Sequence, residues 1–276
     1  MSDSRSKSLF TIAKKEFMDN VRNRWIMALT ALFVIFIVMI STYQGHIRDD
    51  AGFEDIITFS RELNFYLIAI VAIMLGYKTL AKEVESKSIG LLLTSELDRK
   101  EIVLGKFVGL GSVLAFIVIV GFGIGGVISG FTIGFGDSFM YFEFMIASFL
   151  FSLSFLSVSI LISSMVNRRS RALAGGVFIW IFFMIIWDIL LLVGAIATGW
   201  EFEMEGAAVA EFPEWFYQLA LANPADIFYY ITPRITGSEA MAIPDFLSIE
   251  VLWIGFLIWI ILPLVGAALI FDKKDL

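Results

Sequence analysis

The stretch FVGLGSVLAFIVIVGFGIGGVISGF, from Phe107 to Phe131, contains no charged side chain. About 20 consecutive apolar residues suffice for a helix to cross the hydrocarbon core of a bilayer, so this stretch predicts a membrane span. Five similar runs occur in the chain, which is 59% hydrophobic and only 17% charged, typical of an integral membrane protein. We expect spans at about residues 25–43, 63–79, 107–131, 140–166, 172–198 and 251–271.

The basic residues are distributed unevenly between the loops that separate these runs. Of the 20 Lys and Arg residues, 17 lie before the first span, between spans two and three, between spans four and five, or after span six. Only Arg48, Arg61 and Arg234 lie in the loops on the other side. Short cytoplasmic loops retain Lys and Arg during membrane insertion. We therefore expect both termini in the cytoplasm and an all-α, six-span protein of the inner or plasma membrane.

The composition argues against several classes of function. The chain has no cysteine and a single histidine, His46, so it lacks the ligands of the usual transition-metal sites. The acidic residues gather in the outer loops, which argues against binding to nucleic acid. No paired carboxylates or nucleophile–base pair occur in or beside the spans, so we expect neither an enzyme nor a resident cofactor or metal.

Small residues recur at helical spacing in spans three and four. Gly121, Gly123 and Gly126 match G-x-G-x-x-G, but they lie inside a span without the strand that a dinucleotide site requires. Small residues four apart instead let helices approach closely in lipid. We predict that spans three and four pack together through these positions, which are Gly121 with Gly125, Gly126 with Gly130, Gly130 with Gly134, Ser148 with Ser152, and Ser159 with Ser163.

Residues 8–24 predict an amphipathic helix ahead of the first span. Apolar side chains recur at helical spacing, while Lys and Arg occupy the other faces. Such a helix should lie along the inner leaflet as an elbow, in contact with membrane lipid. The apolar positions are Phe10, Ala13, Phe17, Val21 and Trp25.

The outer segment, residues 199–250, predicts short helices on or dipping into the outer leaflet. Pro213 precedes one helical run, and Asn223 followed by Pro224 suits the cap and first position of a second. Aromatic rings favour the headgroup level, although a role in substrate binding is an alternative. These rings are Trp215, Phe216, Tyr217, Phe228, Tyr229 and Tyr230.

Asp188 is the one carboxylate expected well inside a span. An ionisable group there must face protein or water, or stay protonated. One interpretation is a functional polar site, and the other is a hydrogen bond to a neighbouring helix, for instance to a span-four serine. Proton-coupled carriers commonly assemble several acids and bases, so a lone acid weakens the first interpretation.

Residues 82–106 join spans two and three, and their charged and apolar residues alternate at helical spacing. Ile89, Leu92, Leu93 and Leu97 fall on one side, and Asp98 with Glu101 suits the start of a new helix. A short amphipathic helix in the cytoplasm can bury such a stripe in a groove of a soluble partner, or it can lie on the membrane.

This segment resembles the permease subunit of ABC-2 type ABC transporters. The family pattern between spans two and three is close to E-x-E-x-G-[ST]-[LI]-x-x-L-L, followed by a polar turn and a G-K pair. Lys87 replaces the usual Gly, and Glu96-Leu97 replaces the usual Pro. Asn223-Pro224-Ala225-Asp226 is similar to the outer segment of the NosY-type branch, linked to nitrous oxide reductase maturation. The matching residues are Glu83, Glu85, Ser88, Ile89, Leu92, Leu93, Arg99, Gly105 and Lys106.

The resemblance implies a type V exporter-like fold and a division of labour. Two permease subunits, identical or related, would each dock a separate ATPase subunit that binds ATP and Mg²⁺, through a coupling helix at about Glu83–Ser95. The residues implied in coupling are Glu83, Glu85, Ser88, Ile89, Leu92, Leu93 and Arg99. Closure of the ATPases would switch the pathway, usually for export. The alternative is an ATP-independent carrier or channel that uses Asp188.

Overall fold

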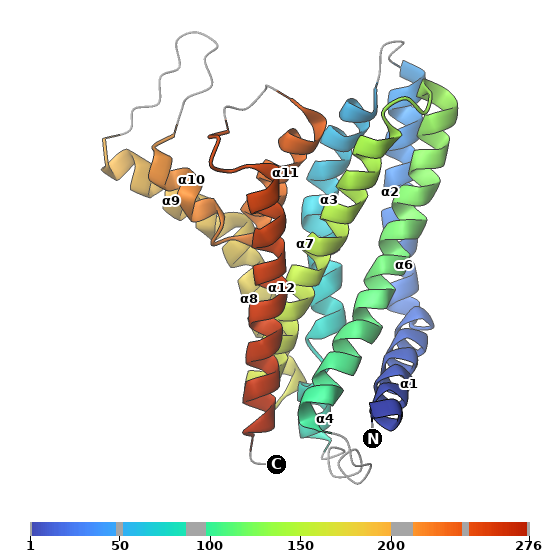
Figure 1. Ribbon diagram of the computed structural model, residues 1–276, viewed down its shortest axis with the longest axis vertical. Helices are drawn as coiled ribbons and strands as arrows, with labels where there is room; N and C mark the ends of the chain where they lie inside the picture. Colours follow the sequence, from blue (N-terminus) through green and yellow to red (C-terminus); the bar gives the residue numbers. More distant parts are fainter. Residues whose placement is uncertain (1, 48–51, 87–97, 200–211, 239–242, 275–276) are drawn as a thin grey trace.

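The computed structural model describes residues 2–47, 52–86, 98–199, 212–238 and 243–274 (Figure 1). Within these ranges the regular structure is helical. The elements are α1 (Ser2–Val21), α2 (Arg24–Ile47), α3 (Phe53–Gly76), α4 (Ala81–Glu85), α6 (Arg99–Ile133), α7 (Ser138–Met165), α8 (Arg169–Ile181), the π-helical turn η1 (Phe182–Ile186), α9 (Trp187–Ala197), α10 (Glu214–Ala220), α11 (Pro224–Thr236) and α12 (Ile249–Asp272).

Six helical runs are long and apolar enough to cross a membrane, which confirms the predicted all-α, six-span fold. Two of them begin well before the predicted spans, at Phe53 instead of residue 63 and at Arg99 instead of residue 107. The second starts at Phe53 because the Asp55 carboxylate accepts a hydrogen bond from the Gly52 N–H at 3.1 Å, which caps the helix. The third starts at Arg99, where the Glu101 carboxylate accepts from the Asp98 N–H at 3.3 Å, as the sequence predicted.

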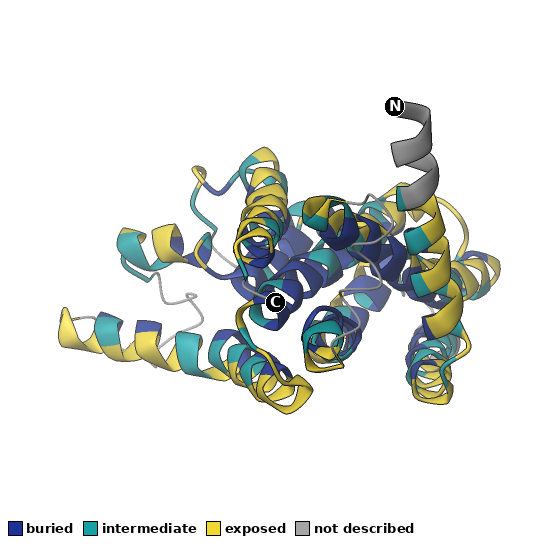
Figure 2. Cartoon of the chain, turned by 90° about the horizontal axis from the view of Figure 1, so that it is seen from below, coloured by how far each residue is buried: buried dark blue, intermediate teal, exposed yellow. Residues whose placement is uncertain are grey.

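Figure 1 places α1, α4 and the C-terminal end of α12 at one end of the bundle, and α10 and α11 at the other. We call these the basic end and the α11 end. The predicted elbow helix is α1, and the chain turns at Arg22 and Asn23 before α2 begins. Seen along the bundle, α1 lies crosswise to the spans (Figure 2). Its buried face, with Ala13 and Asn20, packs on α6, whereas Phe10 and Trp25 are exposed.

Two glycines of span three pack against span one, whereas the sequence predicted packing against span four. A Cβ at Gly121 would lie 2.5 Å from the Phe33 ring, and one at Gly125 would lie 2.5 Å from Ile37. Both neighbours belong to α2, so these glycines let span one approach span three. Gly126 packs on Tyr141 of span four as expected, and a Cβ at Gly125 would lie 3.0 Å from the hydroxyl of the same residue.

The serines of span four bind span two rather than span three. The Ser159 hydroxyl donates to the Ile73 carbonyl at 3.1 Å, and Asn64 donates to the Ser148 hydroxyl at 2.7 Å. Ser163 donates to the Tyr77 carbonyl at 2.7 Å and accepts from the N–H groups of Leu80 and Ala81, both at 3.0 Å. Spans three and four do pack on each other, partly through Gly125 and Gly126, but Gly121 and the serines contact other helices, because spacing identifies a packing face but not its neighbour.

Replacing Ser163 by Ala should destabilise the fold by about 1–2 kcal/mol, because two buried N–H groups at the start of α4 lose their acceptor. Ser164→Ala is the matched control, since the Ser164 hydroxyl bonds only to Leu161 of its own helix, at 2.7 Å. The midpoint of SDS-induced unfolding measures both. Equal midpoints for the two variants would contradict the anchoring role of Ser163.

Helix α11 is buried in the bundle, whereas the sequence predicted a helix on or dipping into the outer leaflet. The ring of Phe228 stacks on that of Phe151, with centroids 4.5 Å apart. The start of the helix follows the prediction, because Asn223 caps it by accepting from the Ala225 N–H at 2.9 Å and Pro224 occupies the first turn. It ends at Gly237, whose φ of +69° suits a residue without a Cβ. The aromatic residues Tyr217, Phe228 and Tyr230 are core residues rather than interfacial ones.

Span five, made of α8, η1 and α9, leans away from the bundle towards the α11 end (Figure 1). Much of its surface is exposed, including Phe178, Ile185, Ile189 and Val193. The π-helical turn Phe182–Ile186 interrupts it directly before Asp188. Such turns often occur at functional sites.

Candidate functional site

At the basic end, one buried lysine joins three helices. The Lys106 ammonium of α6 lies 2.6 Å from the Glu16 carboxylate of α1 and 2.6 Å from the Glu83 carboxylate of α4. Only 6% of the Lys106 side chain is exposed. Because ion pairs shielded from water are weakly screened, this bridge holds the start of the 82–106 segment against the elbow helix.

Two further contacts hold this segment to the rest of the chain. Glu85 accepts hydrogen bonds from the backbone N–H and the Nε of Arg169, the first residue of α8, at 3.1 and 3.0 Å. Arg99, at the start of α6, donates to the carbonyls of Phe271, Asp272 and Lys274 at 3.3, 3.2 and 2.6 Å. Glu85 thus ties the first part of the segment to span five, and Arg99 ties its later part to the C-terminal residues.

The C-terminal residues are anchored in turn. The Lys274 ammonium donates to the carbonyls of Ser164 and Val166 at 2.9 and 2.8 Å, beyond the end of α7. Partial burial lowers the pKa of Lys274. The carbonyl groups at a helix C-terminus carry partial negative charge, which favours a cation there.

Of the residues predicted to couple to a partner, Glu83, Glu85 and Arg99 make contacts within the chain. Ser88, Ile89, Leu92 and Leu93 lie outside the described residues. The predicted roles of all seven stay predictions. Sequence reasoning did not find the contribution of Glu16, since its distance from Lys106 along the chain gives no signal of contact.

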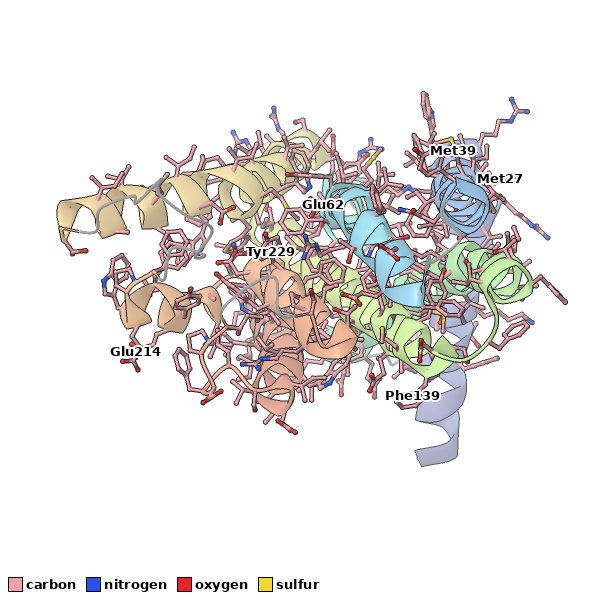
Figure 3. All side chains as sticks on the ribbon, turned by 90° about the horizontal axis from the view of Figure 1, so that it is seen from above. Met27, Met39, Glu62, Phe139, Glu214 and Tyr229 are labelled. Carbon is pink, nitrogen blue, oxygen red and sulfur yellow. The ribbon has the colours of Figure 1, made fainter. Side chains whose placement is uncertain are left out.

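At the α11 end, a cavity of about 350 Å³ opens between α3, span five, α10 and α11. Figure 3 shows Glu62 of α3 beside Tyr229 of α11, with Glu214 farther out on α10. The cavity is lined by Arg61, Glu62, Phe65, Tyr66, Met184, Asp188, Leu191, Phe212, Phe216, Tyr217, Asp226, Tyr229 and Tyr230.

Asp188 faces a second carboxyl group in this cavity, not a serine of span four. Its carboxyl group is in hydrogen-bonding contact with that of Asp226 on α11. Ionised carboxylates only accept hydrogen bonds, so the pair shares a proton. Asp188 thus makes the hydrogen bond to a neighbouring helix that one interpretation predicted, but its partner is a second acid and not a serine. Asp226 was not predicted, because the outer segment was expected to form short helices on or dipping into the outer leaflet.

Hydrogen-bond donors orient Asp226. The Trp187 indole donates to Oδ2 at 3.0 Å, and the Asn223 amide donates to Oδ1 at 3.0 Å. Burial, and then the neighbouring Asp188 carboxylate, raise the pKa of Asp226 to about 8. Burial also raises the pKa of Tyr230, with Asp226 adding to the effect. The pair therefore holds one proton near neutral pH.

The π-helical turn belongs to the same arrangement. Asn223 also donates to the carbonyl of Phe183 at 2.9 Å, a carbonyl within η1. A π-helical turn shifts the backbone hydrogen bonds by one residue and can free a carbonyl group. The wider turn thus presents a carbonyl to the cap of α11 and brings Trp187 and Asp188 to Asp226.

Comparison with known proteins agrees with this architecture. Residues 10–276 match a family described as ABC-2 family transporter protein. The chain is 31% identical to the probable ABC transporter permease protein NosY of Stutzerimonas stutzeri over 96% of this chain and 98% of that protein. It is 28% identical to the protein of the same name from Pseudomonas aeruginosa, over 95% and 94% of the two chains. The chain therefore belongs to the ABC-2 family and is a transmembrane permease subunit of an ABC transporter.

Proposed function

We propose that residues 82–106 dock on a separate ATPase subunit and pass its movements to the membrane spans. The observation that carries this proposal is the bridge from Lys106 to Glu16 and Glu83, both at 2.6 Å. A segment that must transmit force needs rigid attachment at its ends, and this bridge supplies it at the first end. Arg99 supplies the attachment at the second end. In this proposal the basic end lies in the cytoplasm, as the distribution of Lys and Arg favours.

The contacts suggest how movement would reach the cavity. Glu85 is bonded to Arg169, at the start of the helical run that continues through η1 to Asp188. A displacement of the 82–106 segment would therefore act on span five, one wall of the cavity. ATP can change the cavity only by favouring one of two arrangements of this wall over the other. Export is the direction we propose, as usual for the family.

The exposed apolar faces support a dimer. Only 22% of the most apolar window is buried in spans one and five, against 61% in spans two and four. Lipid or another helix must cover these faces in the membrane. We propose that a second copy of the chain, or a related permease, covers part of them.

Leu92→Asp should abolish co-purification of the permease with its ATPase, because a charge would interrupt the apolar stripe expected to enter the ATPase groove. Leu219→Asp is the control, since Leu219 is exposed on α10 at the opposite end. The complex is measured by size-exclusion chromatography of the two subunits expressed together.

Retention of the ATPase by the Leu92 variant would contradict the docking proposal. So would labelling that reaches residues 82–106 only from outside the cell. The paired acids favour one other candidate, a carrier that works without ATP. Transport by the purified chain alone in liposomes, abolished by Asp188→Asn, would establish that function instead.

A further inference from the structure

The walls of the cavity at the α11 end are largely aromatic. Seven of the lining residues given above are Phe or Tyr, from α3, α10, α11 and the residue before Pro213. The face of an aromatic ring carries partial negative charge and attracts cations. One such contact already exists, because the Arg61 guanidinium lies over the Tyr229 ring, 4.5 Å from its centroid.

The charges of the lining leave an excess of negative charge. The Glu62 carboxylate pairs with Arg61 at 2.7 Å and balances it. Asp188 and Asp226 are in hydrogen-bonding contact, and a pair that holds a single proton between its two carboxyl groups keeps one negative charge. None of the cations in the described lining pairs with these two acids. The other titratable groups that face them are Tyr66 of α3, Tyr217 of α10, and Tyr229 and Tyr230 of α11.

The size and chemistry of the cavity favour an organic ion over a metal ion. Its volume of about 350 Å³ is far larger than one bare ion. The described residues contain no group of three His, Cys, Asp or Glu side chains that could hold a metal. Aromatic walls with a few placed polar groups are typical of small-molecule sites.

We propose that this cavity binds an organic cation with an apolar body, whose counter-charge is the pair Asp188 and Asp226. The positive group lies against the two carboxyl groups, and the body packs on the rings of Tyr66, Tyr217 and Tyr229. The ligand replaces the shared proton, which leaves to solvent. This inference rests on the proposed permease function and names a substrate class for it.

Proton and cation compete for the same carboxyl groups, which determines the pH dependence. Burial and the Asp188 charge raise the pKa of Asp226 to about 8, so the shared proton is present at pH 7 and is lost above pH 8. The affinity for a cation should therefore fall as the pH is lowered. We expect a loss of about tenfold between pH 7 and pH 6, and little change above about pH 8.5.

The test uses the purified full-length chain in lipid nanodiscs and benzyltrimethylammonium as the probe, with binding measured by isothermal titration calorimetry at pH 8. We expect saturable binding of this cation and none of benzenesulfonate or benzyl alcohol, which have similar rings. Asp188→Asn and Asp226→Asn should each weaken binding at least about tenfold, because each removes one of the two carboxyl groups that hold the cation. Asp245→Asn is the matched control, because Asp245 is exposed and does not line the cavity.

Folding is checked by the elution volume of each variant. An Asn at position 226 keeps one oxygen acceptor, for either Trp187 or Asn223, so an unchanged elution volume is required before its binding is interpreted. Binding that ignores both Asp variants, that is equal for the anion, or that lacks the pH dependence would overturn the inference. If no probe cation binds while Leu92→Asp still releases the ATPase, the inference fails and the permease proposal stands. If the ATPase never binds while the cation does, the permease proposal fails instead.

Discussion

Replacing Lys106 by Met should lower the free energy of unfolding by about 3–5 kcal/mol. Met keeps an unbranched side chain of nearly the same length but removes the positive charge that pairs with both Glu16 and Glu83. The exposed fractions of the Lys106, Glu16 and Glu83 side chains are 6%, 21% and 17%, so water can solvate the two carboxylates only in part. Two like charges would then lie close together in a poorly solvated place. The midpoint of SDS-induced unfolding of the chain in mixed micelles measures the loss.

Lys100→Met is the control for this variant. Lys100 lies six residues earlier on the same helix and pairs with Asp272 at 3.3 Å, with exposed fractions of 53% and 45%. An exposed pair contributes about 1 kcal/mol at most. Adding Glu16→Gln and Glu83→Gln to Lys106→Met should recover much of the loss, because the uncompensated charges disappear. An unchanged midpoint for Lys106→Met, or no recovery in the triple variant, would show that the three groups do not act as a unit.

The loss should also affect coupling. Through Lys106, the bridge links Glu16 of the elbow helix to Glu83 at the start of the 82–106 segment. If the segment transmits movement as proposed, the triple variant should still fold and bind its ATPase. The rate of ATP hydrolysis by the complex should then increase less when substrate is added. The unfolding midpoint then measures the effect of the bridge on stability, and the substrate response of ATP hydrolysis measures its effect on coupling.

The spans and the caps could be predicted from the sequence because each depends on residues close together in the chain. Apolar length determined the spans, and Asp98 with Glu101 and Asn223 with Pro224 marked where α6 and α11 begin. These signals act within one helical turn. They do not depend on the tertiary arrangement.

The pairing of the helices could not be predicted in this way. Gly121 and Ser159 mark faces that permit close packing, but any of several helices could occupy such a face. The partners, Phe33 of α2 and Ile73 of α3, follow from the whole bundle. Asp226 was missed for the same reason, since burial of α11 depends on Phe151 of a distant span. Asn223 and Pro224 predicted that a helix begins there, but not that this helix is buried in the bundle.

Gly109→Ala should destabilise the chain by about 3 kcal/mol, although the change adds a single methyl group. A Cβ at this position would lie 2.6 Å from the Ala13 carbonyl oxygen and 3.0 Å from the Ala13 Cα. These are backbone atoms of α1, which cannot rotate away as a side-chain end can. The elbow helix must therefore shift as a whole, and Glu16, whose Cβ would be 2.8 Å away, shifts with it and away from Lys106.

Gly123→Ala on the same helix is the control, because no atom lies within 4 Å of a Cβ placed there. Ala is favoured over Gly inside a helix by about 0.5–1 kcal/mol, so this variant should be neutral or slightly more stable. The two substitutions are chemically identical and should act with opposite sign on the unfolding midpoint. Because the shift of α1 already weakens the bridge, Gly109→Ala combined with Lys106→Met should cost less than the sum of the two. Additive losses would mean that the elbow packs on α6 independently of the charge bridge.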